Sequence, residues 1–534
     1  MVGSNSTSLS ISHCTFNGSP FGTGDVIALY GSNANITSST INGQPNTENG
    51  MRFASGSTGT IQSCTIQNCG AGNGIVIQGG SSPAINGNVI QYNQYHGIVS
   101  VENGSAYPVI AGNNIRTNGI LWGGHYYHGV VFYNSTGECT SNSITDNYYG
   151  LIADYYSSVN SGSTNIGTNF LTGNSVGIAS VSNSLMNFGY MYYDEWGGLH
   201  YVGACNDIYD NDVNALANIS GGITAQADWW GSDPPDEGKF STANGGWIDY
   251  SNWKPYLDPD CNDGGWFSIA HLGEDGITFT QDTTASLTKA LGAYFRGDFS
   301  TSGKMFRTIL QNSTLSSERE LALSGLYHVF RRSKNAELVL IIENLQNESS
   351  LGLMASELLS SMYIMKGRYQ EAKTVARDII DWLSNTEYEK RALIRLASLG
   401  AFSETERSDA NDALKELNQK YAAPWMLASW PLSVVLNRQA GQLPVQRRKQ
   451  GEPKSPSTPI PSIPRQRSGS RPKLQALSPS RSLMFLAEKW QSWSTNTEIP
   501  AFTRWNGTPL RWQAGYTSRE LRPKENQQQG ESFY

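Results

Sequence analysis

One short pattern recurs seven times in the first third of this chain, at a period of about 25 residues. In each copy an apolar residue flanked by Asn, Cys or Thr is followed by a glycine that opens a second apolar run. A unit this short cannot bury its own apolar face, so successive units must stack, and self-similarity at this period is typical of solenoid proteins. The apolar anchors are Phe16, Ile41, Ile66, Ile90, Ile115, Ile144 and Leu171, and the glycine anchors are Gly24, Gly50, Gly74, Gly97, Gly129, Gly150 and Gly177.

Composition indicates which solenoid to expect. The apolar runs, such as residues 74–77 and 129–132, are short, rich in Val and Ile, and separated by Asn, Gly, Ser and Thr. Such runs are typical of strands joined by tight turns. Helical periodicity and the leucine ladder of leucine-rich repeats are missing from this region of the sequence. We therefore expect a mainly β protein, a parallel β-helix solenoid followed by a small α-helical region and a disordered tail.

The finer spacing points to a known family. The pattern Asn-x-Ile-x-x-Asn, followed by Gly and an apolar residue, occurs at residues 88–98 and returns at 142–151 and 169–178. It resembles the right-handed parallel β-helix proteins, which include pectate lyase-like enzymes and periplasmic β-helix proteins linked to copper-enzyme maturation. The resemblance covers about residues 1–260 and implies inward-pointing anchors, with Asn at equivalent turns forming amide ladders. Aromatic residues at 228–231 and 250–257 would close the last coil, whose strand edges are otherwise exposed; alternatively, these tryptophans line a sugar site.

Shifts in composition predict five segments: the β-helix at 1–232, its closing segment at 233–262, a linker at 263–300, an α-helical hairpin region at 301–436, and a disordered or frameshifted tail at 437–534. In the helical region apolar residues recur at spacings of three and four. Residues 359–372 resemble the turn of a tetratricopeptide-type hairpin, with Gly367 opening the turn. The alternative is a small helical bundle docked on the end of the β-helix, and either interpretation favours a packing or protein-partner surface.

Charge and cysteine content limit the function. The formal net charge is −7, and no apolar stretch is long enough to cross a membrane, so we expect neither a nucleic-acid partner nor a membrane span. The six cysteines lie in the β region without CxxC spacing, which argues against a thiolate metal site. Cys14 and Cys64 occupy the same repeat position two coils apart, about 10 Å, too far for a disulfide. Cys64 with Cys69, and Cys205 with Cys261, remain as candidate bridges.

The basic composition after residue 438 would ordinarily indicate a solvated tail that binds an anionic surface. Shifting the reading frame, however, allows residues 457–469, 484–496 and 515–532 to be read as three blocks that resemble, in order, the C-terminal sorting domain of type IX secretion. We therefore expect a frameshift between about residues 430 and 455 and a secreted or cell-surface protein. No signal peptide precedes the first repeat, so we expect the gene model to begin inside the protein or to have lost a cap and signal peptide.

Stacked coils align equivalent residues, so a site would be a patch of side chains from successive turns. Aromatic and polar residues concentrate in the middle coils on both sides of the glycine anchors and could flank a shallow groove suited to a polysaccharide or cell-surface glycan. Insertions at residues 123–126 and 190–196 would wall this groove. The predicted carbohydrate-binding residues are Tyr95, His96, Tyr127, His128, Tyr133, Tyr148, Tyr149 and Tyr155.

Catalysis would need additional groups. Hydrolysis requires one protonated and one charged carboxyl group, and the carboxylate candidates are Glu102, Asp146, Asp154, Asp194 and Glu195. A lyase needs a base and a cation such as Ca²⁺, for which the group at residues 207–212 is better interpreted as a polar turn. Copper binding by His125, His128 and His200 would rest on resemblance of fold, which does not transfer function. We expect no cofactor and favour a non-catalytic glycan-binding or adhesion protein, with a polysaccharide lyase or glycoside hydrolase, or a simple spacer, as alternatives.

Overall fold

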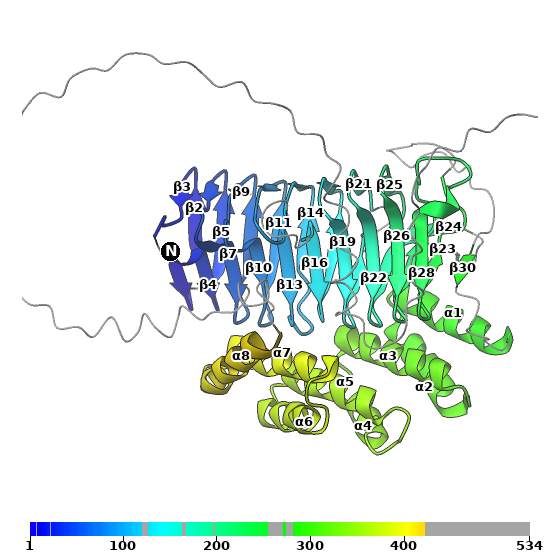
Figure 1. Cartoon of the computed structure of the whole chain (residues 1–534). Helices are drawn as coiled ribbons and strands as arrows, with labels where there is room; N and C mark the ends of the chain where they lie inside the picture. The colour runs from blue at the N-terminus through cyan, green and yellow to red at the C-terminus, as the bar shows by residue number, and fades with distance from the viewer. Residues whose placement is uncertain are drawn as a thin grey trace, which may run out of the picture. The chain divides into compact units, whose positions relative to one another are not determined.

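The computed structural model describes residues 1–254, 271–273 and 281–421, apart from residues 7, 22, 120–126, 163–166, 195 and 197. Within these residues the chain forms a parallel β-solenoid of about nine turns followed by eight α-helices. Figure 1 shows the coils succeeding one another along the solenoid axis. The predicted fold class is therefore confirmed, and the predicted tail lies outside the described residues. The solenoid and the eight helices belong to one compact unit.

Each of the first eight coils contributes one strand to each of three sheets, and every coil-to-coil pairing in these sheets is parallel. Sheet A contains ten strands: β1 (Val2–Ser4), β4 (Gly24–Tyr30), β7 (Thr47–Ala54), β10 (Asn73–Ile77), β13 (Ile98–Val101), β16 (Val130–Tyr133), β19 (Tyr149–Asp154), β22 (Val176–Val181), β26 (Val213–Asn218) and β28 (Phe240–Ala243). Sheet C contains eight shorter strands: β3 (Thr15–Asn17), β6 (Thr40–Asn42), β9 (Thr65–Gln67), β12 (Val89–Gln91), β15 (Asn114–Arg116), β18 (Ser143–Thr145), β21 (Phe170–Thr172) and β25 (Asp207–Tyr209).

Sheet B contains the remaining strands of the coils and ends in antiparallel additions. Its members are β2 (Leu9–Ser12), β5 (Asn33–Thr37), β8 (Thr58–Gln62), β11 (Ser82–Asn86), β14 (Val109–Ala111), β17 (Thr136–Thr140), β20 (Ser158–Asn160), β23 (Leu185–Tyr193), β27 (Gly222–Ala225), β29 (Trp247–Asp249) and β30 (His271–Gly273), with β24 (Leu199–Val202) beside β23. β24 pairs antiparallel with β23, and β30 pairs antiparallel with β29. The β23–β24 pair is a hairpin that interrupts the regular coil.

The apolar anchors of the repeat form one inward column along sheet C. Ile66 pairs in register with Ile41 on one side and with Ile90 on the other. The same register continues to Leu171 and Ile208, and all five side chains are fully buried. Because a strand's side chains alternate between its two faces, this register sends the residues that flank each anchor to the outer surface. This column of side chains runs along the apolar core of the solenoid.

Two ladders of asparagine amides run beside this column, as the sequence predicted. In one of them, the Asn93 amide donates to Oδ1 of Asn118 at 2.9 Å, and the Asn118 amide donates to Oδ1 of Asn147 at 3.3 Å. The other ladder ends where the Asn206 amide donates to Oδ1 of Asp228 at 3.0 Å. These amides also bond to backbone groups of the turns, so the ladders satisfy polar groups that lie out of reach of water.

The glycine anchors are required by lack of space rather than by backbone torsion. A Cβ atom on Gly97 would lie 2.7 Å from the carbonyl oxygen of Gly129, and one on Gly129 would lie 2.6 Å from that of Gly150. Such distances to backbone atoms cannot be relieved by rotating a side chain. The glycines therefore allow successive coils to approach closely where each strand of sheet A begins.

The C-terminal end of the solenoid is filled by large aromatic side chains. Trp230, Tyr250 and Trp253 are buried in the same core as the anchors, and the ring of Phe240 stacks on Tyr250 at 4.3 Å between centroids. A short 3₁₀ helix, η1 (Glu237–Lys239), lies in the segment between them.

The cysteines give one correction. Cys64 and Cys69 are both free thiols, so that candidate bridge is wrong. Each cysteine occupies its own buried position along the coil. Cys205 is disulfide-bonded, and its predicted partner Cys261 lies outside the described residues.

The helices are α1 (Gln281–Phe295), α2 (Phe299–Asn312), α3 (Ser316–Ser333), α4 (Ala336–Leu345), α5 (Gly352–Met365), α6 (Tyr369–Trp382), α7 (Glu387–Phe402) and α8 (Arg407–Tyr421), with a 3₁₀ turn η2 (Glu404–Glu406) before α8. α1 begins inside the segment that the sequence predicted as a linker, 263–300. Helices α5 and α6 form the predicted hairpin, with Gly367 at φ +71° in its turn and Ala372 buried between the two helices. No helix in the described ranges is long and apolar enough to cross a membrane.

Candidate functional site

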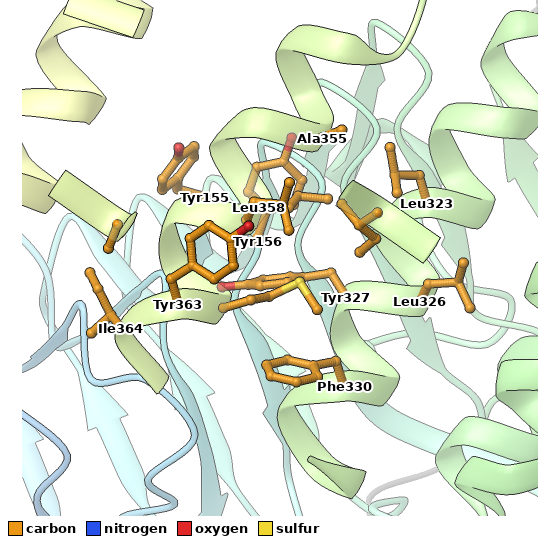
Figure 2. Packing of buried hydrophobic residues seen from close by; sticks show 14 of the residues in the cluster. Tyr155, Tyr156, Leu323, Leu326, Tyr327, Phe330, Ala355, Leu358, Tyr363 and Ile364 are labelled. Atoms are coloured by element: carbon orange, nitrogen blue, oxygen red, sulfur yellow. The ribbon is translucent and has the colours of Figure 1, made fainter. Parts of the chain in front are cut away.

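The helices cover the outer face of sheet A in the middle coils. Val99, Val101 and Val131 point away from the solenoid core and are buried in one apolar cluster with side chains of the helices. Figure 2 shows Tyr155 and Tyr156 of the solenoid beside Tyr327 of α3 and residues of α5. Each fully buried apolar side chain of this size contributes about 1.5–3 kcal/mol. The contact therefore joins the two regions firmly.

A buried polar network fixes the position of the helices on this face. The Asn134 amide donates to Glu102 Oε2 at 2.7 Å and to Ser361 Oγ of α5 at 2.9 Å. The Tyr327 hydroxyl of α3 donates to Asn134 Oδ1 at 2.8 Å. Arg331 of α3 donates to the backbone carbonyl of Tyr156 at 2.7 Å. These bonds have specific geometry, so they allow one docking position rather than a sliding apolar contact.

A second part of the network centres on Tyr155. Its hydroxyl donates to Glu357 Oε1 of α5 at 2.9 Å and accepts from Arg395 Nη2 of α7 at 2.8 Å. The guanidinium of Arg391 lies over the Tyr155 ring, 4.7 Å from its centroid. Nε of Arg395 is 4.0 Å from Glu102 Oε2. Two buried acids are thus balanced by arginines that come from the helices.

This arrangement determines where three predicted residues lie. Tyr133 and Tyr155, predicted to bind carbohydrate, are buried under the helices, and Tyr155 is only 1% exposed. Glu102 is 4% exposed, and its burial raises the pKa of its carboxyl group while Arg395 opposes that rise. In this structure these three side chains contact the helices. They were predicted to form one half of the groove, and α3, α5 and α7 fill that half.

Among the described residues, the other acid candidates Asp146, Asp154 and Asp194 make no hydrogen bond with Glu102. Asp154 sits at the end of β19, where burial raises the pKa of its carboxyl group and Arg391 opposes the rise. Asp146 is exposed in the turn after β18. Asp194 lies in the β23–β24 hairpin, and Glu195 falls outside the described residues.

The other half of the predicted groove does form an aromatic column. The rings of Tyr95 and Tyr127 lie 4.6 Å apart between centroids, and those of His96 and His128 are stacked at 4.9 Å. The backbone N–H of His128 donates to His96 Nδ1 at 3.1 Å. Tyr149 continues the column, with its ring 4.7 Å from that of His128.

Most of this column is turned away from water. His96, Tyr127 and Tyr149 are buried, and burial lowers the pKa of His128 to about 3. The His128 imidazole is therefore neutral at ordinary pH. Tyr95, His128 and Tyr148 are partly exposed, so they are the members of the predicted set that a ligand could touch.

Two strongly exposed aromatic side chains lie on the β23–β24 hairpin. Trp196 is 85% exposed and Tyr193 is 71% exposed. The Tyr192 ring stacks on His200 at 5.2 Å between centroids with an interplanar angle of 20°. Beside them, Arg296 lies 5.4 Å from the centroid of Tyr192. Aromatic rings presented this way offer flat apolar faces with polar groups at their edges.

Asp194 holds the tip of this hairpin in shape. Its Oδ1 accepts the N–H of Trp196 at 2.9 Å and that of Gly198 at 2.7 Å. Its Oδ2 lies 2.8 Å from His200 Nε2. The His200 hydrogen bond, followed by the Gly198 N–H, lowers the pKa of the Asp194 carboxyl group. The base of the hairpin is tied to the helical region, since Arg296 Nη1 donates to the Tyr190 hydroxyl at 3.1 Å.

The sequence predicted this segment as a wall of the groove and did not assign its aromatic residues to a contact surface. The signal was present in the alternation of aromatic residues in 190–193, which faces a second alternating run in 199–202 across a Gly-Gly pair. That pattern is typical of an antiparallel hairpin, in which Tyr192 pairs directly with His200.

A second group that the sequence analysis did not single out lies on β4 and β7 of sheet A. Arg52 donates from Nε to Asp25 Oδ2 at 2.6 Å and from Nη2 to Oδ1 at 3.1 Å. The Asn49 amide donates to Asp25 Oδ1 at 2.6 Å. Burial, followed by the negative charge of Asp25, raises the pKa of the nearby Glu48 carboxyl group. Asp25 and Arg52 are 27 residues apart, close to one repeat, and this spacing could have revealed their contact across neighbouring coils.

The structure assembles no metal site from the predicted ligands. His128 stacks on His96, His200 contacts Asp194, and His125 falls outside the described residues. Asp207 of the 207–212 group lies 3.9 Å from the Lys254 ammonium. Over the described part of the chain, no cluster of three or more His, Cys, Asp or Glu side chains could hold a metal ion.

Comparison with known proteins agrees with the parallel coils of the solenoid. Residues 1–171 match the family model described as a right handed beta helix region. Over these residues the chain is similar to right-handed β-helix proteins. The matched residues make up about a third of the chain, and the structure continues the same coils beyond them to β29. No curated protein and no solved structure matches the chain.

Proposed function

We propose that this chain is a secreted or cell-surface β-helix protein that binds polysaccharide without cleaving it. The observation that carries the proposal is the β23–β24 hairpin, where exposed Tyr193 and Trp196 stand on a turn fixed by Asp194. Sugars bind to such rings through their apolar faces, while polar groups at the ring edges select orientation. The helices that cover Glu102 and Tyr155 support a binding role over catalysis in the middle coils.

Binding to a panel of soluble and insoluble polysaccharides, measured by gel retardation and by co-sedimentation, tests this proposal. We expect Trp196→Ala to weaken binding to the recognised polysaccharide about tenfold, which corresponds to about 1.4 kcal/mol. Trp382→Ala is the matched control, since Trp382 is another tryptophan, 76% exposed on α6 and remote in sequence from the hairpin. Retention by the folded Trp196 variant at the strength of the parent protein, or no retention of the parent on any polysaccharide, would contradict the proposal.

Export is the part of this proposal that rests on the sequence alone. Its support is the three blocks after residue 438 that resemble a type IX sorting domain once the frame is shifted. Resequencing the gene across codons 430–455 tests it directly. An added or missing base is the expected result, and an unaltered frame would remove the support for this export route.

A hydrolase or lyase is the second candidate, and the group around Arg52 favours it. Glu48 has a carboxyl group of raised pKa near an Asp25 carboxylate that accepts from Arg52 and Asn49. Acid–base catalysis on a glycosidic bond needs one protonated and one ionised group. Release of reducing ends or unsaturated uronates by the parent protein, lost in Glu48→Gln, would establish this function. If the parent protein releases no product from any polysaccharide of the panel, binding remains the proposed function.

The helical region also keeps its predicted role as a surface for a protein partner. Leu340 of α4 and Trp382 of α6 are large apolar side chains exposed on helices, away from the buried contact with the solenoid. The tetratricopeptide-like character of α5 and α6 is part of this proposal. A double variant, Leu340→Ser with Trp382→Ser, should keep glycan binding and lose capture of any partner found with the parent protein.

A further inference from the structure

A pocket lies between the solenoid and the helical region, far along the chain from the β23–β24 hairpin. Its volume is about 460 Å³, within the usual range for small-ligand sites. The solenoid contributes the turns that carry Ser82 and Tyr107, and the helices contribute residues from the C-terminal ends of α3, α5 and α7. The pocket thus exists only because the two regions are docked.

Part of the wall of this pocket is aromatic and apolar, and the solenoid turns supply small and polar residues. Tyr107, Tyr369 and Phe402 line it together with Met365 of α5. The Tyr107 hydroxyl accepts a hydrogen bond from the Asn160 amide at 2.9 Å, so this ring is held in place. A flat apolar ligand would find ring faces on several sides, and Ser82 would supply a hydroxyl group.

The charge of the pocket is positive. Lys334 is the charged residue among the described residues that line it. Its ammonium has neither a hydrogen bond nor an ion pair with any residue in the described ranges. Arg332 lies over the Tyr107 ring at 3.9 Å from its centroid, and the Lys366 ammonium donates to the Lys334 carbonyl at 2.8 Å. One lysine therefore lines the pocket, two further cationic residues contact Tyr107 and Lys334, and the described lining residues bring no carboxylate.

The backbone of Lys334 has the conformation of a helix C-cap. The residue ends α3 in the left-handed conformation, at φ +54°. Gly or Asn is favoured at this position because a larger side chain is strained there. Here the strained position is occupied by the side chain that brings positive charge to the pocket.

We propose that this pocket binds a small organic carboxylate with a flat apolar body, the carboxylate on the Lys334 ammonium and the body between Tyr369 and Phe402. A charge-assisted hydrogen bond to the ammonium supplies the specificity for an anion, and the aromatic walls supply the preference for a ring. This site is separate from the hairpin and does not depend on polysaccharide binding there.

Ligand-observed NMR titration of the full chain tests the proposal with three probes. Benzoate has both the carboxylate and the flat body, benzamide has the same shape without the charge, and acetate has the charge without the body. We expect saturable binding of benzoate, at least tenfold weaker binding of benzamide, and at least tenfold weaker binding of acetate. Equal binding of benzoate and benzamide, or no benzoate binding by the folded protein, would overturn the proposal.

Variants locate the site. Lys334→Asn removes the ammonium and keeps a residue that tolerates the left-handed backbone, so we expect benzoate affinity to fall at least tenfold with an unchanged melting temperature. Lys304→Asn removes an exposed lysine of α2 and should leave benzoate binding unchanged. Trp196→Ala should also leave it unchanged. Loss of benzoate binding in Trp196→Ala, or full binding in Lys334→Asn, would place the ligand elsewhere and overturn the proposal.

Discussion

Nη2 of Arg395 donates a hydrogen bond to the hydroxyl of Tyr155 at 2.8 Å, and this bond joins the seventh helix to a residue of the solenoid 240 positions earlier in the chain. Arg395 also donates to the backbone carbonyl of Glu357 at 2.6 Å and is 2% exposed. Its charge has no route to water. It is therefore balanced by Glu102 and Glu357 within the protein.

Replacing Arg395 should consequently be severe. In Arg395→Met the buried acids lose their counter-charge, and breaking one partner of a buried pair typically costs about 3–5 kcal/mol. We expect a fall of that size in the free energy of unfolding measured by urea denaturation. The control is Arg377→Met, which breaks the exposed 3.3 Å pair with Asp409 and should cost less than about 1 kcal/mol. A small effect at Arg395 would mean that the network does not fix the helices.

Acid should destabilise the fold through its buried histidines. Burial lowers the pKa of His128 and of His328 to about 3, whereas unfolded histidine titrates near pH 6.5. Their neutral state thus contributes stability that is fully present above about pH 6.5 and is lost as the pH falls towards 3. Each adds a slope of up to about 1.4 kcal/mol per pH unit to the free energy of unfolding in that window.

The variant His328→Asn isolates one of these contributions. His328 contacts the Asn183 carbonyl at 3.1 Å and lies near Arg331, whose charge lowers its pKa further. The slope of unfolding free energy against pH between 4 and 6 should become shallower by about 1 kcal/mol per unit. His13→Asn, at an exposed site on the first coil, should keep the parent slope. Parallel curves for parent and His328→Asn would show that this histidine takes up its proton in the folded state.

Because successive coils approach closely, adding a single methyl group at a glycine anchor should destabilise the fold. Gly97→Ala would place a Cβ atom 2.7 Å from the Gly129 carbonyl oxygen and 2.8 Å from Ile115 Cγ2. The coils would have to separate, at a cost of about 1–3 kcal/mol or more. Gly238→Ala meets only the movable Asp236 side chain, at 3.2 Å, and should be nearly neutral. Thermal unfolding of both variants checks this, and equal melting temperatures would contradict it.

The hairpin turn gives a prediction in which polysaccharide binding should change while the stability of the fold should not. Asp194→Ala removes the acceptor for the N–H groups of Trp196 and Gly198, so the aromatic side chains lose their fixed positions. We expect polysaccharide binding to weaken several-fold, while the melting temperature stays within about 2 °C of the parent because the turn is outside the solenoid core. Asp194→Asn keeps an acceptor oxygen and should retain most of the binding. Equal polysaccharide binding by the parent, Asp194→Ala and Asp194→Asn would show that the shape of this turn does not matter for binding.

The repeat was enough to predict the coils, because the anchor at Ile66 and its neighbours pair at the spacing that the sequence shows. The sequence allowed a helical bundle docked on the end of the solenoid, but the position of the helices against sheet A was not predicted, since it depends on outward-facing residues that carry no period. A signal was nevertheless present. β13 reads Ile98-Val99-Ser100-Val101, with apolar residues at both inward and outward positions, as in strands that are covered on both faces.

The candidate site was harder to predict from the sequence for a related reason. Tyr133 and Tyr155 were assigned to a glycan because tyrosines on an outer face suggest a contact surface, yet that surface is occupied by the chain's own helices. Local sequence cannot distinguish a ligand from a distant segment that fills the same place. Asp194 was proposed as an acid, and its role in the turn follows from backbone N–H groups that no residue pattern displays.

The helices have a mechanical consequence for the solenoid. A stack of coils pulled from its two ends would ordinarily unravel one coil at a time, because each repeat holds only its neighbours. Here the helical region contacts the solenoid at points from Ser55, which bonds to the Ala401 carbonyl at 3.0 Å, to Tyr190, which bonds to Arg296 at 3.1 Å. The helical region therefore holds the intervening coils together. Under tension those coils would unfold together in one large step, while the coils that the helices do not contact would unfold one at a time at lower force.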